Sequence, residues 1–127
     1  MNILDEHIPE NQRQLLESWG FKCKQIGNEV GYKGILDKQI ITILHRLQNP
    51  TFFTRDQHFY NRKLCHNNYC LCFLDIGKEE VSVFIRDFMK HKQYNMKAKR
   101  MGNVFKIKQS SIRLWKINNT EEIEINW

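Results

Sequence analysis

The chain has 127 residues, which is enough for one compact domain with one core and hardly enough for two. Hydrophobic residues make up 41% and charged residues 27%, an ordinary balance for a globular protein, and no apolar run approaches the length of a membrane span. Met1 leads directly into the acidic pair Asp5 and Glu6 without a basic start and an apolar stretch, so we expect a cytoplasmic protein without a membrane partner.

The formal net charge is +6, and it is unevenly distributed. Between Arg86 and Lys116 the basic residues are numerous and Asp87 is the only acidic residue. This asymmetry suits a polyanionic partner, because each neutralised phosphate releases counterions. A solvated basic surface without a partner has the same composition, so charge alone leaves both interpretations open.

Strands and helices are expected to alternate through the first half of the chain. A short apolar strand covers residues 2–4, and a helix runs from about Pro9 to Gly20, with its apolar residues at helical spacing. Alternation over 21–26 predicts a second strand, and 27–34 contains three glycines and is expected to be a loop. The strongest helical pattern spans 36–47 and ends before a proline.

The second half continues the alternation and then changes. The expected elements are a buried strand over 51–54, a short helix over 57–64, a strand over 69–74, a helix around 81–88 and a hairpin formed by 104–108 and 112–117. We therefore predict an α/β fold in which helices flank a parallel sheet. The chain forms one domain over 1–127, with a core of about 1–92 and a basic hairpin of about 103–117.

The last residues alternate apolar and polar side chains, with Ile123, Ile125 and Trp127 in phase. This pattern is typical of a strand, and such a strand could pair with a second copy of the chain or with another protein. A homodimer is therefore one expectation for the tail.

Carboxylates follow the predicted strands at the positions where each strand ends. Asp5 and Glu6 follow the first strand, Asp56 follows the third, Asp75 follows the fourth, and Asp37 opens the strongest helix. The carboxyl ends of parallel strands share one edge of a sheet, where ligands collect. Clustered carboxylates are the ligands that Mg²⁺ and Mn²⁺ prefer, and such ions support hydrolysis of phosphate esters.

Each of these residues also has an ordinary structural explanation. Asp5 and Asp56 stand just before helices, where a short carboxylate caps free backbone N–H groups. Asp37 lies in a first helical turn, which favours an acid, and Asp75 precedes a turn. Only their shared position at strand ends favours a site.

Three local patterns resemble a known family. Residues 3–9 (ILDEHIP), 34–37 (GILD) and 53–59 (FTRDQHF) are similar to three motifs of the compact bacterial PIN-like domains, relatives of the VapC-type toxins. The motifs occur in the family's order and spacing, and the resemblance covers essentially the whole chain. It implies a PIN-like fold and a ribonuclease dependent on Mg²⁺ or Mn²⁺. It further implies a toxin that a small antitoxin protein holds inactive.

The resemblance also assigns roles to residues of this chain. It implies that Asp5, Asp37 and Asp56 bind the metal, that Glu6 is a further catalytic carboxylate beside them, and that Thr54 orients Asp56 through its hydroxyl group. Arg55 is placed to meet a phosphate, and we expect RNA to lie along a basic surface that includes Lys97, Arg100, Lys106 and Lys108.

The sequence departs from the family pattern at His7, where asparagine is usual, and at Asp75, which has no consistent acidic counterpart. A non-catalytic module that binds RNA or a partner protein is therefore the alternative function. Cys65, Cys70 and Cys72 with a neighbouring histidine allow a zinc site, although their spacing does not match the paired Cys-x-x-Cys pattern, and buried thiols are the simpler interpretation.

Overall fold

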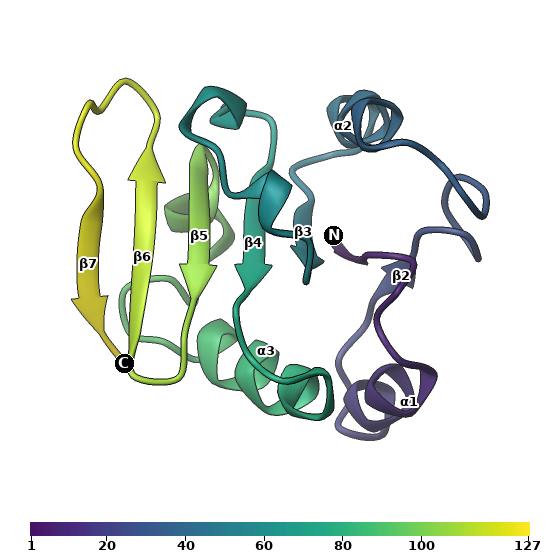
Figure 1. Ribbon diagram of the computed structural model, residues 1–127. Coiled ribbons are helices and arrows are strands. Elements are labelled where there is room, and N and C mark those ends of the chain that lie inside the picture. The colour runs from purple at the N-terminus through teal and green to yellow at the C-terminus, as the bar shows by residue number, and fades with distance from the viewer.

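The computed structural model describes residues 1–127 and contains a seven-stranded sheet between two layers of helices (Figure 1). None of its helices is long and apolar enough to cross a membrane. In chain order the elements are β1 (Asn2–Leu4), α1 (Glu10–Ser18), β2 (Lys24–Gln25), α2 (Asp37–Arg46), β3 (Thr51–Thr54), the 3₁₀ helices η1 (Gln57–Phe59) and η2 (Arg62–Leu64), β4 (Cys70–Leu74), the 3₁₀ helix η3 (Lys78–Glu80), α3 (Val81–Met89), α4 (Lys97–Arg100), β5 (Asn103–Ile107), β6 (Ser111–Lys116) and β7 (Ile123–Asn126).

The strands are arranged in the order β2-β1-β3-β4-β5-β6-β7. All pairs from β2 to β5 are parallel, whereas β6 and β7 run antiparallel to their neighbours. The predicted parallel α/β sheet with a C-terminal hairpin is therefore confirmed. The carboxyl ends of the five parallel strands share one edge of the sheet, which we call the carboxyl edge, and their starts share the opposite, amino edge.

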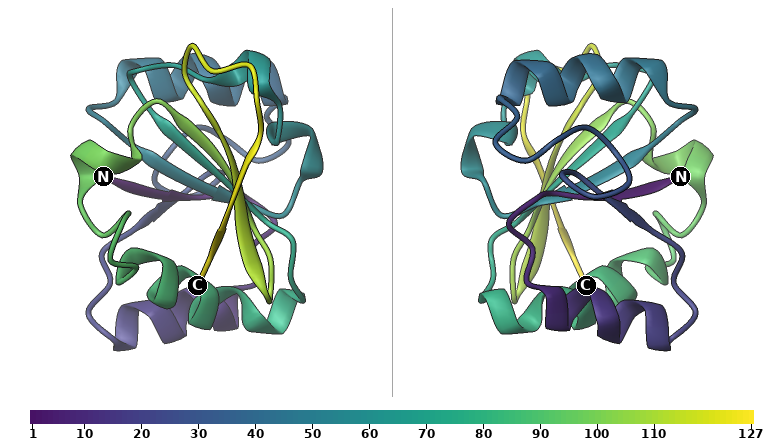
Figure 2. Two further views of the ribbon diagram at one scale, coloured as in Figure 1. Left: turned by 90° about the vertical axis from the view of Figure 1, so that its left-hand side faces the viewer. Right: turned by 90° about the vertical axis from the view of Figure 1, so that its right-hand side faces the viewer.

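Helices cover both faces of the sheet, as the two edge-on views show (Figure 2). On one face α1 and α3 contribute side chains such as Leu16 and Ile85 to a cluster with Leu4. On the other face α2 contributes Ile40 to a second cluster, together with Ile3. Neighbouring residues of β1 thus enter different clusters, because successive side chains of a strand point to opposite faces. Coverage on both sides explains why all residues of β3 and β4 are buried.

Three elements differ from the sequence-based predictions. The strand expected over 21–26 pairs only at Lys24–Gln25. The helix expected over 57–64 is two 3₁₀ helices, because Asn61 interrupts the first and its side chain accepts a hydrogen bond from the Lys63 N–H to begin the second. Helix α4 was not predicted, since four residues carry too little periodicity to be recognised.

The C-terminal tail forms the predicted strand, and it pairs with its own chain. In β7, Ile123 lies opposite Leu114 and Ile125 lies opposite Ile112 of β6. No strand lies on the outer side of β7, which is the last strand of the sheet. The contact with a second copy or an antitoxin therefore stays a prediction, and it concerns only this outer side.

Candidate metal centre at the carboxyl edge

A pocket of about 370 Å³ opens at the carboxyl edge, where β1, β3 and the start of α2 meet. Three segments that are distant in sequence supply its walls. Its lining residues are Asp5, Glu6, His7, Ile8, Ile35, Asp37, Ile40, Arg55 and Asp56. Asp5, Asp37, Asp56, Glu6 and Arg55, which the sequence singled out, therefore lie around one space.

Asp5 is the most buried carboxylate of the pocket, with 9% of its surface exposed. Its Oδ1 accepts a hydrogen bond of 2.7 Å from the Glu6 N–H, and its Oδ2 accepts one of 2.5 Å from the Thr54 hydroxyl. Burial raises the pKa of Asp5, and these two hydrogen bonds act against the rise. The carboxylate is thus fixed in position.

The Thr54 hydroxyl contacts two of the predicted site residues. It donates its proton to Asp5 and accepts a hydrogen bond of 3.0 Å from the backbone N–H of Asp56. The predicted hydrogen bond between the Thr54 hydroxyl and Asp56 is therefore present, through the Asp56 backbone, and Thr54 positions the Asp5 carboxylate as well. It joins the ends of β1 and β3 with one buried group.

Asp37, Asp56 and His58 form the group most suited to holding a cation. One potential ligand atom from each lies within 4.8 Å of those of the other two. The Asp37 carboxylate accepts no hydrogen bond from the chain, so it does not cap its own helix. Partial burial and then the negative charges of Asp56 and Asp5 raise the pKa of Asp37. The carboxylates repel one another in the absence of a cation.

One oxygen of the Asp56 carboxylate has a structural role. Its Oδ1 accepts a hydrogen bond of 2.9 Å from the His58 N–H at the start of η1 and lies 2.9 Å from Nδ1 of the His58 ring. The helix-capping interpretation therefore describes this oxygen, and the Asp56 carboxyl group also lies close to that of Asp37. His58 was missed by the sequence analysis, because an exposed histidine two residues after an aspartate has no distinctive spacing.

Glu6 and Arg55 both line the pocket, and both also contact the backbone. The Glu6 carboxylate accepts hydrogen bonds of 3.0 and 3.1 Å from the Gly34 N–H, and Gly34 has a φ of 81° that favours glycine. Glu6, which follows β1, thereby fixes the end of the 27–34 loop, and this loop leads directly to Asp37. The Arg55 guanidinium reaches the Ile76 carbonyl at 3.3 and 3.4 Å and remains exposed.

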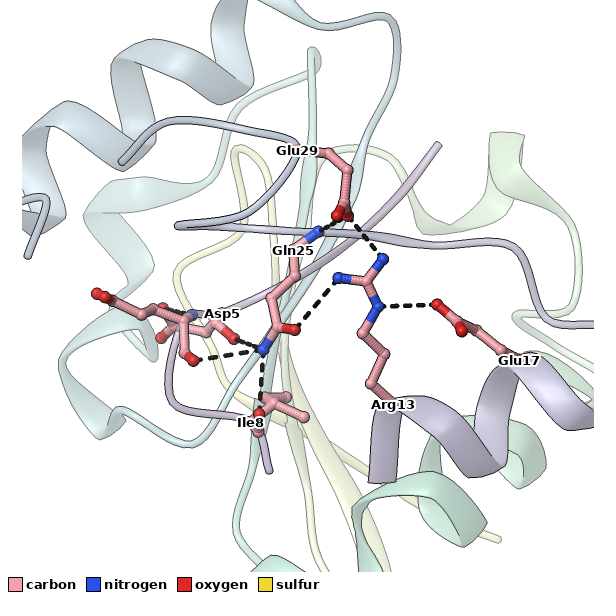
Figure 3. A network of polar contacts seen from close by, with 7 residues as sticks. Asp5, Ile8, Arg13, Glu17, Gln25 and Glu29 are labelled. Carbon is pink, nitrogen blue, oxygen red and sulfur yellow. Dashed lines mark hydrogen bonds and ion pairs between the residues drawn. The ribbon is translucent and has the colours of Figure 1, made fainter. Parts of the chain in front are cut away.

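A buried polar network supports the turn that carries Asp5 and Glu6 (Figure 3). The Gln25 side chain is 3% exposed, and its Nε2 donates to the carbonyls of Asp5, Glu6 and Ile8 at 3.0, 3.3 and 3.0 Å. The Gln25 Oε1 accepts from Arg13, which is bound in turn by two glutamates. The sequence offered one signal for Gln25, a polar residue in phase with the apolar residues of its strand.

The four basic residues predicted to bind RNA do not form one surface. Arg100 is 4% exposed and donates to the Thr51 hydroxyl and the Tyr94 carbonyl at 3.2 and 3.0 Å, so its assignment to the RNA surface is corrected to a structural role. Lys97 lies in α4, near the amino edge. Lys106 and Lys108 lie toward the carboxyl edge, with the Lys106 ammonium 5.6 Å from the centre of the Tyr60 ring.

Asp75 lies at the carboxyl edge but outside the pocket, and it is exposed.

The thiols of Cys70 and Cys72 are buried 3.7 Å apart, and Cys65 approaches the Trp115 carbonyl. Asp37, Asp56 and His58 are the group of three ligand-bearing side chains whose atoms gather within 4.8 Å of one another, and Asp5, which lines the pocket with Asp37 and Asp56, is not among them.

Carboxylate oxygens and His7 line a pocket open to solvent, and the His58 imidazole, which is not part of the lining, lies beside Asp56. Such oxygen and nitrogen ligands suit a divalent cation. Comparison of the chain with family models, with curated proteins and with solved structures finds no match.

Proposed function

We propose that the chain is a PIN-like, divalent-metal-dependent ribonuclease that acts in the cytoplasm as the toxin of a toxin–antitoxin pair. The observation that carries the proposal is the convergence of Asp5, Asp37 and Asp56 on one pocket at the carboxyl edge. These residues come from three separate segments, and folding has placed them together although their charges repel. The repulsion among the three carboxylates lowers the stability of the fold, and a cation bound between them would explain why they are nevertheless brought together.

The side chains of the pocket fit Mg²⁺ or Mn²⁺. Asp5, Asp37 and Asp56 would hold the ion, since hard cations prefer carboxylate oxygens, and His58 would add a nitrogen ligand that Mn²⁺ tolerates better than Mg²⁺. When bound, the ion would neutralise charge on a phosphate and lower the pKa of a bound water.

The remaining side chains of the pocket have supporting tasks in the proposed reaction. The Thr54 hydroxyl keeps Asp5 oriented, and Glu6 keeps the loop before Asp37 in place. The exposed Arg55 guanidinium, on the wall of the pocket, is available to bind a non-bridging oxygen of the RNA phosphate. Ile8, Ile35 and Ile40 form an apolar wall that limits water around the bound phosphate.

The toxin part of the proposal rests on the three motifs at 3–9, 34–37 and 53–59, which resemble those of the PIN-like family. A cytoplasmic location agrees with four free cysteines, two of which are fully buried thiols. Expression of the wild-type chain in a bacterial host should arrest growth, whereas the Asp56→Asn variant should be tolerated at the same protein level.

The decisive experiment is cleavage of a mixed RNA pool with Mg²⁺ or Mn²⁺. Wild type should cleave, and both Asp56→Asn and addition of EDTA should abolish cleavage. Asp75→Asn is the matched control, because this exposed aspartate lies at the same edge outside the pocket and its removal should leave cleavage intact. Cleavage that persists in Asp56→Asn would show that another nuclease or another site is responsible.

A non-catalytic RNA-binding module is the second candidate, and one observation favours it. The ion pairs of the chain all involve arginine or histidine, so its lysines have no carboxylate partners and are free to bind phosphates. RNA binding without cleavage under any divalent metal would support this function over the ribonuclease.

A further inference from the structure

The largest groove of the protein lies far from the carboxylates, toward the amino edge. It has a volume of about 630 Å³ and is formed by the segment after α3, by α4 and the start of β5, by the end of β6, and by Ile123 and Ile125 of β7. Its polar lining includes Lys92, Lys99 and Lys116, and its apolar lining includes Met101, Ile123 and Ile125. No carboxylate lines it.

The positive charge of this groove is not neutralised by the chain. None of its three lysines takes part in any of the ion pairs. Glu122 and Glu124 flank the β7 residues of the groove, but alternate residues of a strand point to opposite faces. Both glutamates are paired with Arg113, at 3.6 and 2.9 Å. The groove therefore retains a net positive charge beside an apolar floor.

The basic surface continues beyond the groove along the same edge. Lys22 and Lys24 line a smaller pocket of about 270 Å³ with Met1, at the starts of β1 and β2. Lys97 and Arg100 lie near the Met1 amino group. Burial and then the positive charges of these two residues lower the pKa of that group. From β2 to β6 the edge crosses five strand spacings, about 24 Å. A row of this length matches several consecutive phosphates better than one small anion.

We propose that the lysine edge, formed by Lys22, Lys24, Lys92, Lys97, Lys99 and Lys116, binds the backbone of single-stranded RNA and that the groove accommodates one of its nucleotides. The lysines bind phosphates, and the apolar floor supports a base. Gln93 has no side-chain partner, and the Asn103 amide donates only to the Lys99 carbonyl, so both can bond to base edges. RNA as the ligand rests on the proposed function.

The observations favour RNA over an acidic peptide. A peptide that paired with the outer side of β7 would use the groove alone, whereas the lysines extend across the sheet to β2. The exposed Gln93 amide at the groove suits the donors and acceptors of a base. The parallel strands, at most five residues long, separate this edge from the acidic pocket by about 17 Å. RNA bound here is therefore held at the edge opposite the proposed cleavage pocket, not in the pocket itself.

The test measures binding of a fluorescein-labelled oligouridine of about 12 nucleotides by fluorescence anisotropy, in EDTA and with Asp56→Asn present in every protein. The groove variant carries Lys92→Gln, Lys99→Gln and Lys116→Gln. The control carries Lys33→Gln, Lys63→Gln and Lys78→Gln, three exposed lysines outside the edge, so both variants have the same net charge. Thermal unfolding verifies that both are folded.

The groove variant should bind about tenfold more weakly, and the slope of log K against log salt should fall by about 2, whereas the control should match the parent. Equal losses in the two variants would overturn the proposal in favour of general charge attraction. Competition by polyglutamate as effective as that by oligouridine would overturn it in favour of an acidic peptide. This assay measures binding without cleavage. Its result therefore does not depend on whether the chain proves to be a ribonuclease.

Discussion

The two edges of the sheet carry different charged features: a pocket lined by carboxylates at one edge and a groove lined by lysines at the other. At the carboxyl edge, Asp5, Asp37 and Asp56 line a pocket, where partial burial and then repulsion by Asp56 and Asp5 raise the pKa of Asp37. At the amino edge, lysines line a groove from which carboxylates are absent. Asp5 is fixed by hydrogen bonds from Glu6 and Thr54, whereas the lysines of the groove take part in no ion pair.

The difference follows from the direction of the strands. In a parallel sheet, residues that follow the strands meet at one edge, and residues that precede them meet at the other. Asp5 and Asp56 follow β1 and β3, whereas Lys22 precedes β2 and Lys99 precedes β5. Chain topology thus brings these carboxylates to an edge where a pocket suits a cation, and these lysines to an edge where they suit a polyanion.

The largest expected effect concerns the one basic side chain of the amino edge that is buried. Arg100→Met should lower the free energy of unfolding by about 2–3 kcal/mol, because the Tyr94 carbonyl and the Thr51 hydroxyl lose their donor. Lys97→Met, in the same short helix but exposed, should change it by less than about 0.5 kcal/mol. Urea denaturation measures both. Equal effects would mean that Arg100 belongs with the solvent-exposed lysines.

A smaller effect is expected at the carboxyl edge, from the hydroxyl group that joins β1 to β3. Thr54→Val should weaken Mn²⁺ binding about 10- to 100-fold, because Asp5 loses the donor that orients it. Thr54→Ser keeps the hydroxyl and should retain most of the affinity. Isothermal titration calorimetry at pH 7 compares the three proteins. A Val variant that binds Mn²⁺ as tightly as wild type would remove Asp5 from the metal site.

The architecture could be predicted from the sequence because it depends on local patterns. Alternation of apolar strands with helical stripes implied a parallel sheet, and the strand ends implied where Asp5 and Asp56 would meet. Asp37 was placed correctly because it opens the helix with the clearest stripe, α2. In each case residues within one segment carried the information, and the topology of parallel sheets supplied the rest.

The features that sequence analysis missed depend on contacts between distant segments. Arg100 resembled its neighbouring lysines, and only the approach of Thr51 reveals that it is buried. Gln25 acquires its role because the turn after β1 presents three carbonyls to it. His58 contacts Asp56 two residues before it, but it comes near Asp37 only because the start of α2 lies close to the end of β3. No spacing within one segment encodes these contacts.

The smallest expected effect tests whether the crowded carboxylates are relieved by a metal. Because the folded protein raises the pKa of Asp5 and of Asp37, each contributes stability below its unfolded pKa, near 4, and loses that contribution as pH rises through the folded pKa. Mn²⁺ binds the ionised carboxylates, so its stabilising effect should grow over the same pH range. At pH 7 and ten times the dissociation constant it should reach about 1.4 kcal/mol, and near pH 4 it should almost vanish.

Thermal unfolding with and without Mn²⁺, from pH 4 to pH 7, measures this effect. Asp37→Asn should reduce both the fall in stability with pH and the response to Mn²⁺, because it removes one of the charges that repel. Asp75→Asn, at the same edge but outside the pocket, should preserve both. If Asp75→Asn reduced the Mn²⁺ response as much as Asp37→Asn, the cation would be responding to the charge of the whole carboxyl edge. Asp37 would then not belong to a built metal site distinct from the rest of the carboxyl edge.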